Sequence, residues 1–352
     1  ALWKDFNAAE IFPQRSLWRK LEVRLWKLRP LGHSWGDQFY GDRVARELDQ
    51  LLVEFAPNLV IFEEMWLYRY LKTVKRYNCR IIYDAHNIET SLSQDLNRSA
   101  SQQSLTVESK LLETKTASIE RYLMQNTDQV WVCSQEEVPL LQKLCDRVPP
   151  VHVVANGINV ADYHRDRVPT IELEPNPFTL LFTASFSYQP NSVAAEILID
   201  QIYPQLRKSY PNCRLILAGH SPTPRMKEAA KMDSGILVTG KVPDMRPYLT
   251  AASVTIVPLL TGGGTRLKIL EAFAASSPVV STTKGAEGLN VQNGQHLLIR
   301  DSVEEMVAGV SQLWSDTDLV EKLTESALEL VQKEYSWDAV RQNVGDAVRK
   351  LL

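Results

Sequence analysis

The residues best suited to chemistry lie at positions 258–274, in the sequence PLLTGGGTRLKILEAFA. A triple-glycine run precedes a stretch that predicts a helix, and the free backbone N–H groups at a helix start attract anions. Glycine has no Cβ, so the backbone can come close to a diphosphate. The segment therefore predicts an anion site, although an ordinary glycine turn with solvated cations remains the alternative.

Two charged residues of the predicted helix share one face. Lys268 and Glu271 are three positions apart, so an ammonium and a carboxylate can line the same pocket. Arg266 cannot share that face if the helix is regular. We expect it to reach the anion from the edge of the loop or to serve another purpose.

The elements around this segment predict an α/β fold. Short apolar runs alternate with amphipathic stretches, which is typical of parallel sheets covered by helices on both faces. In such sheets the functional loops follow the carboxyl ends of the strands. The predicted strands are residues 59–62, 80–83, 130–133, 151–154, 179–183, 214–217, 236–238, 254–257, 278–281 and 296–299. The clearest predicted helices are residues 44–55, 105–124, 192–209 and 266–275.

The polar, proline-bearing stretch at residues 166–177 predicts a boundary between two domains. We expect an N-terminal domain at residues 1–170 and a C-terminal domain at residues 177–334. Residues 1–58 contain no convincing strand and no glycine turn, so the first domain is expected to lack its opening strand or strands.

Composition fits a globular protein and excludes several classes. The chain has 352 residues, 44% of them hydrophobic, and a net charge of −3, so we expect no nucleic-acid partner. The four cysteines form no CxxC pair and the histidines show no metal-ligand spacing, which favours a cytoplasmic protein without a metal site. No apolar run approaches the roughly 20 residues that a membrane span needs.

Charge is concentrated at residues 15–29, which hold six basic residues and one acid. Leucines recur at helical spacing in this stretch. One interpretation is a basic amphipathic helix at the inner face of a membrane, and the other is an ordinary helix that buries its leucines against the domain.

An ordered set of short segments resembles the retaining glycosyltransferases of family 4 (glycosyl transferases group 1), in the subgroup with a GGGTR-type loop. The resemblance runs from about Asp84 to the C-terminus. It is carried by DAHNIE at residues 84–89, VCS at 132–134, ANGIN at 155–159, FTAS at 182–185, LAG at 217–219, TGKVPD at 239–244, GGGTRLKILEA at 262–272, PVVS at 278–281, GAEGL at 285–289 and YSW at 335–337.

The resemblance implies the GT-B fold, with two Rossmann-like domains that face each other across a cleft. The second domain would bind a nucleotide diphosphate sugar. The first would bind the acceptor, which could be a glycan, a lipid-linked glycan or a small molecule. Transfer would retain the anomeric configuration and need no metal or other cofactor. Residues 335–352 would form a helix that crosses back to the first domain.

The resemblance also implies roles for single residues. His86 would face the donor sugar, the alternative being a histidine bonded to its own loop; Lys268 would neutralise the leaving diphosphate, and Glu271 would hold the donor ribose. These three form the expected catalytic set. The expected donor-binding residues are Gly219, Val242, Gly262, Gly263, Gly264, Thr265, Arg266, Lys268 and Glu271. The expected cleft-lining residues are Asp84, Asn87, Asn156, Gly157 and Ser185.

The chain departs from the family pattern at two places. Gly263 stands where many relatives have a glutamate that contacts the sugar, and residues 184–189 lack the usual arginine and lysine. We expect Arg266 and Lys268 to supply that positive charge instead. Two alternatives stay open, namely a nucleotide-sugar 2-epimerase of the same fold and a non-catalytic donor-binding remnant or partner subunit.

Overall fold

The computed structural model describes residues 25–99, 106–264 and 266–352, and it divides into two compact units. The first unit contains the described residues up to Val154 together with Asn343–Leu352, and the second is Ala155–Gln342. The first unit therefore ends before residue 170, where the sequence placed the boundary.

The segment that follows Val154 packs on the second unit. The Ile158 amide donates to the Tyr335 carbonyl at 2.8 Å, and the Arg246 guanidinium donates to the Asp162 carbonyl at 2.8 Å. Polar, proline-bearing composition indicates a segment exposed to solvent, but it does not reveal which neighbouring sheet that segment joins.

The first unit contains a four-stranded parallel sheet in the order β1-β2-β3-β4. No strand precedes β1 among residues 25–58. The strands are β1 (Leu59–Glu63), β2 (Arg80–Ala85), β3 (Gln129–Val132) and β4 (Val151–Val153). The helices are η2 (Leu25–Leu28), η3 (Gly36–Phe39), α2 (Asp42–Phe55), η4 (Met65–Tyr70), α3 (Leu71–Val74), α4 (Glu89–Ser99), α5 (Val107–Asn126), η6 (Gln135–Glu137) and α6 (Val138–Leu144).

Helix α5 shows how this sequence builds its core. Thr106 caps the helix, because its hydroxyl accepts a 3.1 Å hydrogen bond from the Ser109 amide. One turn-spaced pair, Ile119 and Leu123, is fully buried in the same cluster as Val130 of β3. The apolar spacing of the helix thus fixes the face that it turns toward the sheet.

The second unit contains a six-stranded parallel sheet in the order β10-β9-β8-β5-β6-β7. Numbered from β5, this is the doubly wound order 3-2-1-4-5-6, whose direction of winding reverses between β5 and β8. Ligands of such sheets bind at the carboxyl ends of the strands beside this reversal. The strands are β5 (Thr179–Thr183), β6 (Arg214–Ala218), β7 (Ile236–Gly240), β8 (Val254–Val257), β9 (Val279–Ser281) and β10 (Leu298–Ile299).

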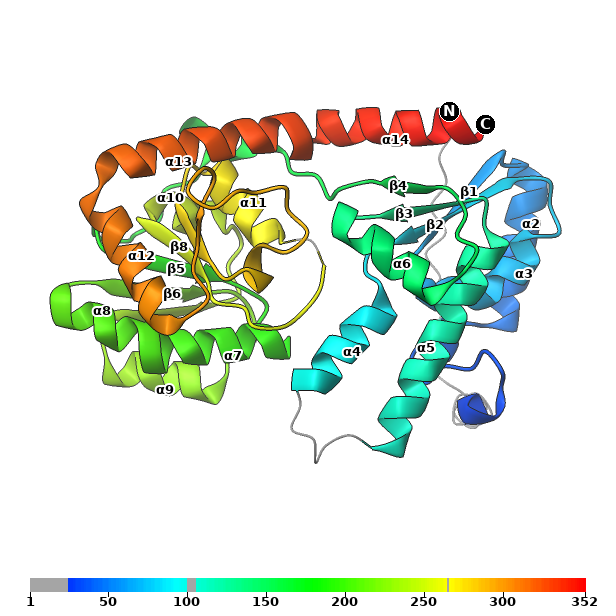
Figure 1. The fold of residues 1–352 in the computed structure, drawn as a ribbon, viewed down its shortest axis with the longest axis horizontal. Helices are drawn as coiled ribbons and strands as arrows, with labels where there is room; N and C mark the ends of the chain where they lie inside the picture. The colour runs from blue at the N-terminus through cyan, green and yellow to red at the C-terminus, as the bar shows by residue number, and fades with distance from the viewer. Residues whose placement is uncertain (1–24, 100–105, 265) are drawn as a thin grey trace. The chain divides into compact units, whose positions relative to one another are not determined.

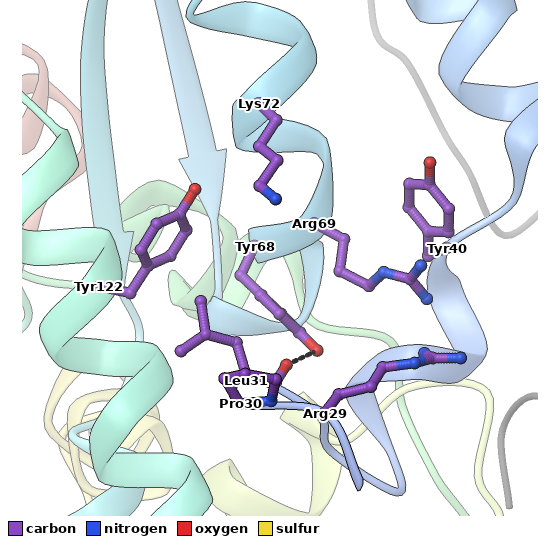
Figure 2. Close-up of a pocket in the computed structure, with 8 residues that line it drawn as sticks. All are labelled: Arg29, Pro30, Leu31, Tyr40, Tyr68, Arg69, Lys72 and Tyr122. Carbon is purple, nitrogen blue, oxygen red and sulfur yellow. Dashed lines mark hydrogen bonds between the residues drawn. The ribbon is translucent and has the colours of Figure 1, made fainter. Parts of the chain in front are cut away.

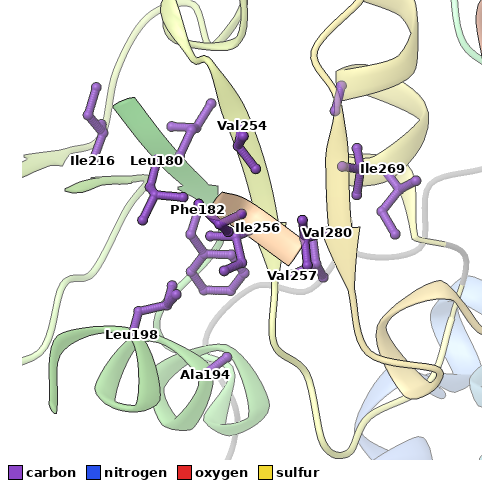
Figure 3. Close-up of a cluster of buried hydrophobic side chains, with 14 of the residues drawn as sticks. Leu180, Phe182, Ala194, Leu198, Ile216, Val254, Ile256, Val257, Ile269 and Val280 are labelled. Carbon is purple, nitrogen blue, oxygen red and sulfur yellow. The ribbon is translucent and has the colours of Figure 1, made fainter. Parts of the chain in front are cut away.

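Helices cover both faces of this second sheet, with α7, α8 and α9 on one side and α10, α11 and α13 on the other (Figure 1). The buried cluster between them includes Phe182 of β5, Val254 of β8 and Ile269 of α11 (Figure 3). The helices are η7 (Val160–Tyr163), η8 (Arg165–Arg167), α7 (Gln189–Ile197), η9 (Leu198–Ile202), α8 (Tyr203–Ser209), α9 (Pro224–Met232), α10 (Arg246–Ala251), α11 (Leu267–Ala274), η10 (Lys284–Ala286), α12 (Val303–Ser315), α13 (Thr317–Leu330) and η11 (Val331–Tyr335).

The last helix, α14 (Trp337–Leu351), starts in the second unit and ends in the first. Ala347 is buried with Ile82 and Trp131, and its carbonyl accepts a 3.2 Å bond from the Gln129 amide side chain. Ala347, near the end of α14, is therefore part of the first unit's core.

The predicted basic helix at residues 15–29 falls mostly outside the described residues. In the described part, Leu25 and Leu28 are exposed and Trp26 is buried. Among the described helices, none combines the length and the apolar composition that crossing a membrane would require.

Candidate functional site

The glycine loop follows β8 at the reversal point of the second sheet. Gly262 and Gly264 have φ angles of 108° and 82°, a region that residues with a Cβ rarely adopt. A Cβ on Gly262 would lie 3.0 Å from the Tyr188 hydroxyl. Gly263 lies between them, and Thr265 falls outside the described residues. The loop thus needs glycine for both its conformation and its close packing.

Arg266 stabilises this loop through hydrogen bonds to backbone carbonyl groups. Its Nη1 donates to the Gly263 carbonyl at 2.8 Å, and its Nη2 donates to the carbonyls of Gly262 at 2.9 Å and Lys284 at 3.1 Å. The side chain is only 5% exposed, and burial lowers its pKa. Direct contact with a diphosphate fits this arrangement poorly, because both terminal nitrogens already bind backbone oxygens. Arg266 instead orders the turn.

Lys268 lies on the first turns of α11 and is held over the end of β5. Its Nζ lies 2.9 Å from Asn191 Oδ1 and 4.5 Å from the centroid of the Phe182 ring. Burial, and next the nearby Arg266, lower the pKa of Lys268 to about 7, while Glu271 opposes the shift. A partly desolvated cation of this kind gains from an anionic ligand.

Asn191 holds the Lys268 side chain in place. Its Oδ1 accepts from Lys268, while its Nδ2 donates to the Ser185 carbonyl at 2.8 Å. The asparagine, at the start of α7, therefore ties the loop after β5 to the helix after β8. The partner that gives Asn191 this role, Lys268, lies 77 positions further along the chain.

Glu271 lies one turn beyond Lys268 and accepts a 3.1 Å hydrogen bond from the Tyr163 hydroxyl. Burial raises the pKa of Glu271, whereas Tyr163 and Lys268 lower it. Burial and then the Glu271 charge raise the pKa of Tyr163 well above its usual range, so Tyr163 stays a hydrogen-bond donor. No sequence signal pointed to Tyr163, because it lies 108 positions earlier in the chain.

The other predicted donor-side residues also follow strands of the second sheet. Gly219, after β6, has a φ angle of 146°, and a Cβ there would lie 1.7 Å from the Ala184 carbonyl oxygen. Ser185 follows β5 and shares a 2.9 Å hydrogen bond with the Ser187 hydroxyl. Val242 follows β7 and is half-buried. All three therefore lie at the carboxyl edge of the strands, as Lys268 does.

In the first unit, Asp84 and His86 come from the carboxyl end of β2. His86 Nδ1 lies 3.4 Å from Glu64 Oε1, and Nε2 lies 3.7 Å from Asp84 Oδ2. Hydrogen bonds to Asp84 and then Glu64 raise the pKa of His86 to about 10 despite partial burial. With this pKa the imidazole favours the protonated form at neutral pH, and both of its N–H groups face carboxylates. Glu64, at an unusual φ of 64°, was not predicted from the sequence.

The turn after β2 continues into α4 with support from α5. Glu120, which is 1% exposed, accepts bonds from the Glu89 amide at 2.7 Å and the Thr90 amide at 3.1 Å. Burial raises the pKa of Glu120 to about 7. Asn87 Oδ1 is buried and has no hydrogen-bond partner among the described residues. Asn87 is therefore held in the turn with one acceptor still open.

Asn156 and Gly157 lie in the second unit, not in the N-terminal domain that the sequence assigned them to. Asn156 is exposed. Gly157 packs under Trp337, where a Cβ would lie 2.8 Å from the indole Cε3. Ile158 pairs with Ser336 just beyond. The turn thus packs against the start of α14.

The described residues hold no group of three or more histidine, cysteine, aspartate or glutamate side chains that could bind a metal ion. Whether the reaction needs a metal stays a prediction. His86 belongs to the first unit and α11 to the second, so the distances given above apply within each unit separately. That the units face each other across a cleft also stays a prediction.

Among known proteins, a family model matches part of the second unit, whereas one relative and several solved structures match most of the chain. Residues 177–316 match the family model described as Glycosyl transferases group 1. An uncharacterized 44.6 kDa protein in the cps region of Klebsiella pneumoniae is 22% identical over 156 residues, which cover 42% of this chain and 40% of that protein. The match thus spans well under two thirds of that relative. The lipopolysaccharide 1,2-N-acetylglucosaminetransferase of Salmonella typhimurium is 21% identical over 328 residues, covering 88% of this chain and 77% of that enzyme.

Solved structures agree on the fold. Sucrose-phosphate synthase from Thermosynechococcus elongatus has a TM-score of 0.67 at 18% identity, covering 87% of this chain and 77% of that one. Anabaena HepE in complex with UDP has a TM-score of 0.64 at 13% identity, and the match covers 88% of this chain and 82% of HepE. The chain therefore has the GT-B fold, and its second unit contains a glycosyl transferases group 1 domain.

Proposed function

We propose that the chain is an enzyme that transfers a sugar from a nucleotide diphosphate sugar to a glycan acceptor. The observation that carries the proposal is the pairing on α11. Lys268 and Glu271 share one face at the reversal point of a doubly wound sheet, each held by a polar partner from another segment. A cation for phosphate and a carboxylate for hydroxyl groups then lie one helical turn apart.

The mechanism follows from the charges of these residues. Breaking the bond between a sugar and a diphosphate builds negative charge on the leaving oxygen, and a preorganised cation stabilises that charge. Lys268 is desolvated, so it is the candidate for this role. The glycine turn held by Arg266 would bring backbone N–H groups to the phosphates. Glu271, fixed by Tyr163, would accept hydrogen bonds from the ribose.

The finer features of the proposal depend on resemblance. We propose a UDP-sugar donor, because structures of Anabaena HepE hold UDP, glucose or UDP-glucose. Retention of the anomeric configuration follows the resemblance to family 4. A role in surface polysaccharide synthesis, at the cytoplasmic face of a membrane, is supported by relatives named for lipopolysaccharide and for a cps region.

Calorimetry with UDP, GDP and ADP tests the donor site. We expect one nucleotide to bind the wild type, and Lys268→Ala to weaken it about tenfold or more, the effect of losing one charge-assisted hydrogen bond. Lys322→Ala, on the exposed face of α13, is the matched control and should bind normally. If Lys268→Ala binds as tightly as the control does, this donor site is wrong.

Incubating the enzyme with the nucleotide sugar that binds separates transfer from epimerisation. Transferase activity gives free nucleotide diphosphate only when an acceptor or water takes the sugar. Conversion of the sugar without an added acceptor would instead favour the 2-epimerase alternative. NMR of the anomeric proton of the product would report retention or inversion.

A further inference from the structure

A pocket that the donor-side residues do not line lies within the first unit. It is formed by the loop before η3, the η4–α3 segment and helix α5, and its volume is about 360 Å³ (Figure 2). This volume is within the range of small-molecule sites. Three cations and three tyrosines contribute to its lining, namely Arg29, Arg69, Lys72, Tyr40, Tyr68 and Tyr122.

Cations predominate among the charged residues that are described at this pocket. The buried carboxylate of Asp37 lies 2.9 Å from Arg29 Nη1 and 3.8 Å from Arg69 Nη1, and it accepts a 2.6 Å bond from the Tyr68 hydroxyl. One carboxylate thus forms a hydrogen-bonded ion pair with Arg29 and a longer ion pair with Arg69. Lys72 is exposed and contacts no acidic group in the described part of the chain. Lys72 is therefore the cation of this set that is best placed to meet an anionic ligand.

The walls of the pocket are aromatic. The Arg69 guanidinium lies 3.7 Å from the centroid of the Tyr40 ring, which fixes the arginine by a cation–π contact. In the view of Figure 2, the Lys72 ammonium lies between Tyr122 and Arg69. Tyrosine offers an apolar ring face and a polar tip. Such a surface suits a ligand that has both C–H faces and hydroxyl groups.

We propose that this pocket binds an anionic sugar, either a sugar phosphate or a sugar acid, as part of the acceptor. The cations would hold the phosphate or carboxylate, and the tyrosine rings would pack against the sugar. The assignment to the acceptor rests on the proposed transferase function. It comes from the first unit, which does not contain the donor-side residues Lys268 and Glu271.

Titrating the full chain with glucose 6-phosphate, glucuronate and glucose tests the pocket. At low ionic strength we expect each anion to bind about tenfold more tightly than glucose, because one charge-assisted contact corresponds to at least that factor. Whichever of the two anions binds more tightly shows whether the pocket prefers a phosphate or a carboxylate. Lys72→Gln should remove most of the preference, and melting curves would show that this surface variant stays folded.

Lys75→Gln is the matched control, because Lys75 is exposed just after α3 and outside the pocket. It should leave anion binding unchanged. Equal affinity for the anions and glucose would overturn the proposal, and so would anion binding that Lys72→Gln leaves intact. Anion binding lost in Lys268→Ala instead would place the probe in the donor site and likewise overturn it.

Nucleotide binding keeps the two proposals apart. Lys72→Gln should bind UDP normally, and Lys268→Ala should bind glucose 6-phosphate normally. If the wild type binds no nucleotide but binds the anions through Lys72, the donor site is wrong and the pocket stands as an anionic-sugar site. If UDP binds through Lys268 while no anion prefers the pocket, only the pocket proposal fails.

Discussion

The α11 site of the second unit and the β2 edge of the first unit use the same structural position with opposite electrostatics. Both follow the carboxyl end of a parallel strand. At α11, burial lowers the pKa of Lys268 to about 7. At the β2 edge, hydrogen bonds to Asp84 and then Glu64 raise the pKa of His86 to about 10. One site destabilises its cation and the other stabilises it.

This difference shows that strand ends alone do not set the chemistry of a site. Lys268 has one neutral oxygen and an aromatic ring beside it, and the Glu271 carboxylate only partly offsets its burial, so the cation can attract an anion. His86 has a carboxylate beside each of its two ring nitrogens, so its positive charge is already compensated and it needs no further anion. The cation on α11 is therefore suited to an anionic group such as phosphate, whereas the cation at the β2 edge is already balanced within the first unit.

The largest expected effect concerns pH at the α11 site. Lys268 loses its proton as the pH rises through about 7, whereas a bound diphosphate would restore it. UDP affinity should therefore fall by up to tenfold for each pH unit above 7. Calorimetry at pH 8 in buffers of different ionisation enthalpy should show uptake of about one proton per UDP bound.

Lys268→Met provides the control for this pH dependence. Phosphate itself is mostly doubly ionised above its second pKa of about 6, so the nucleotide contributes little to the change above pH 7. The variant should bind weakly and with an affinity that changes little between pH 7 and 8, a range below the ionisation of the uracil base. Proton uptake that persists in Lys268→Met would assign the titration to another group.

A smaller effect is expected at the β2 edge, where Glu64→Gln should lower the pKa of His86. The glutamate raises that pKa through its hydrogen bond and charge, so its removal leaves Asp84 as the main partner. NMR titration of the imidazole should show His86 protonated from pH 6 to 8 in the wild type, with a lower pKa in the variant. Glu63→Gln, on the neighbouring exposed residue, is the control. A wild-type histidine that titrates near 6.5 would remove the contrast between the two sites.

The smallest effect is expected from Tyr163→Phe, which removes one hydrogen bond to Glu271. UDP affinity should fall about threefold, within the range for a single hydrogen bond. The pKa of Glu271 should also rise, because the tyrosine lowers it. If Tyr163 acts by positioning Glu271 against the ribose hydroxyl groups, Tyr163→Phe should not change the affinity for 2′,3′-dideoxy-UDP, which lacks them. An equal loss for both nucleotides would contradict the ribose role.

Much of the fold follows from local sequence patterns. The apolar runs predicted at residues 179–183 and 254–257 coincide with β5 and β8, because continuous β-branched and apolar stretches are buried on both faces of a parallel sheet. The glycine turn and the shared helix face of Lys268 and Glu271 could be predicted from the sequence in the same way. Backbone freedom and helical spacing depend on residues near in sequence, so one chain suffices to predict them.

Contacts between distant segments were not predictable in this way. Arg266 looked like a ligand for phosphate, yet its guanidinium binds backbone carbonyls, one of them 18 positions away. Asn191 reaches Lys268 across 77 positions, and Tyr163 reaches Glu271 across 108. A side chain's type states what it can bind, and only the packing of the sheet and helices decides which partner comes within reach.

The sequence by itself determined the parallel sheets, the glycine turn and the cation and carboxylate on one helix face. Tertiary structure alone decided that residues 155–176 join the second unit, that Arg266 orders the loop, and that Lys268 and His86 shift their pKa values in opposite directions. Spacing along the chain sets a residue's face, whereas desolvation and the nearest charges, which set its protonation, come from segments that only folding brings together.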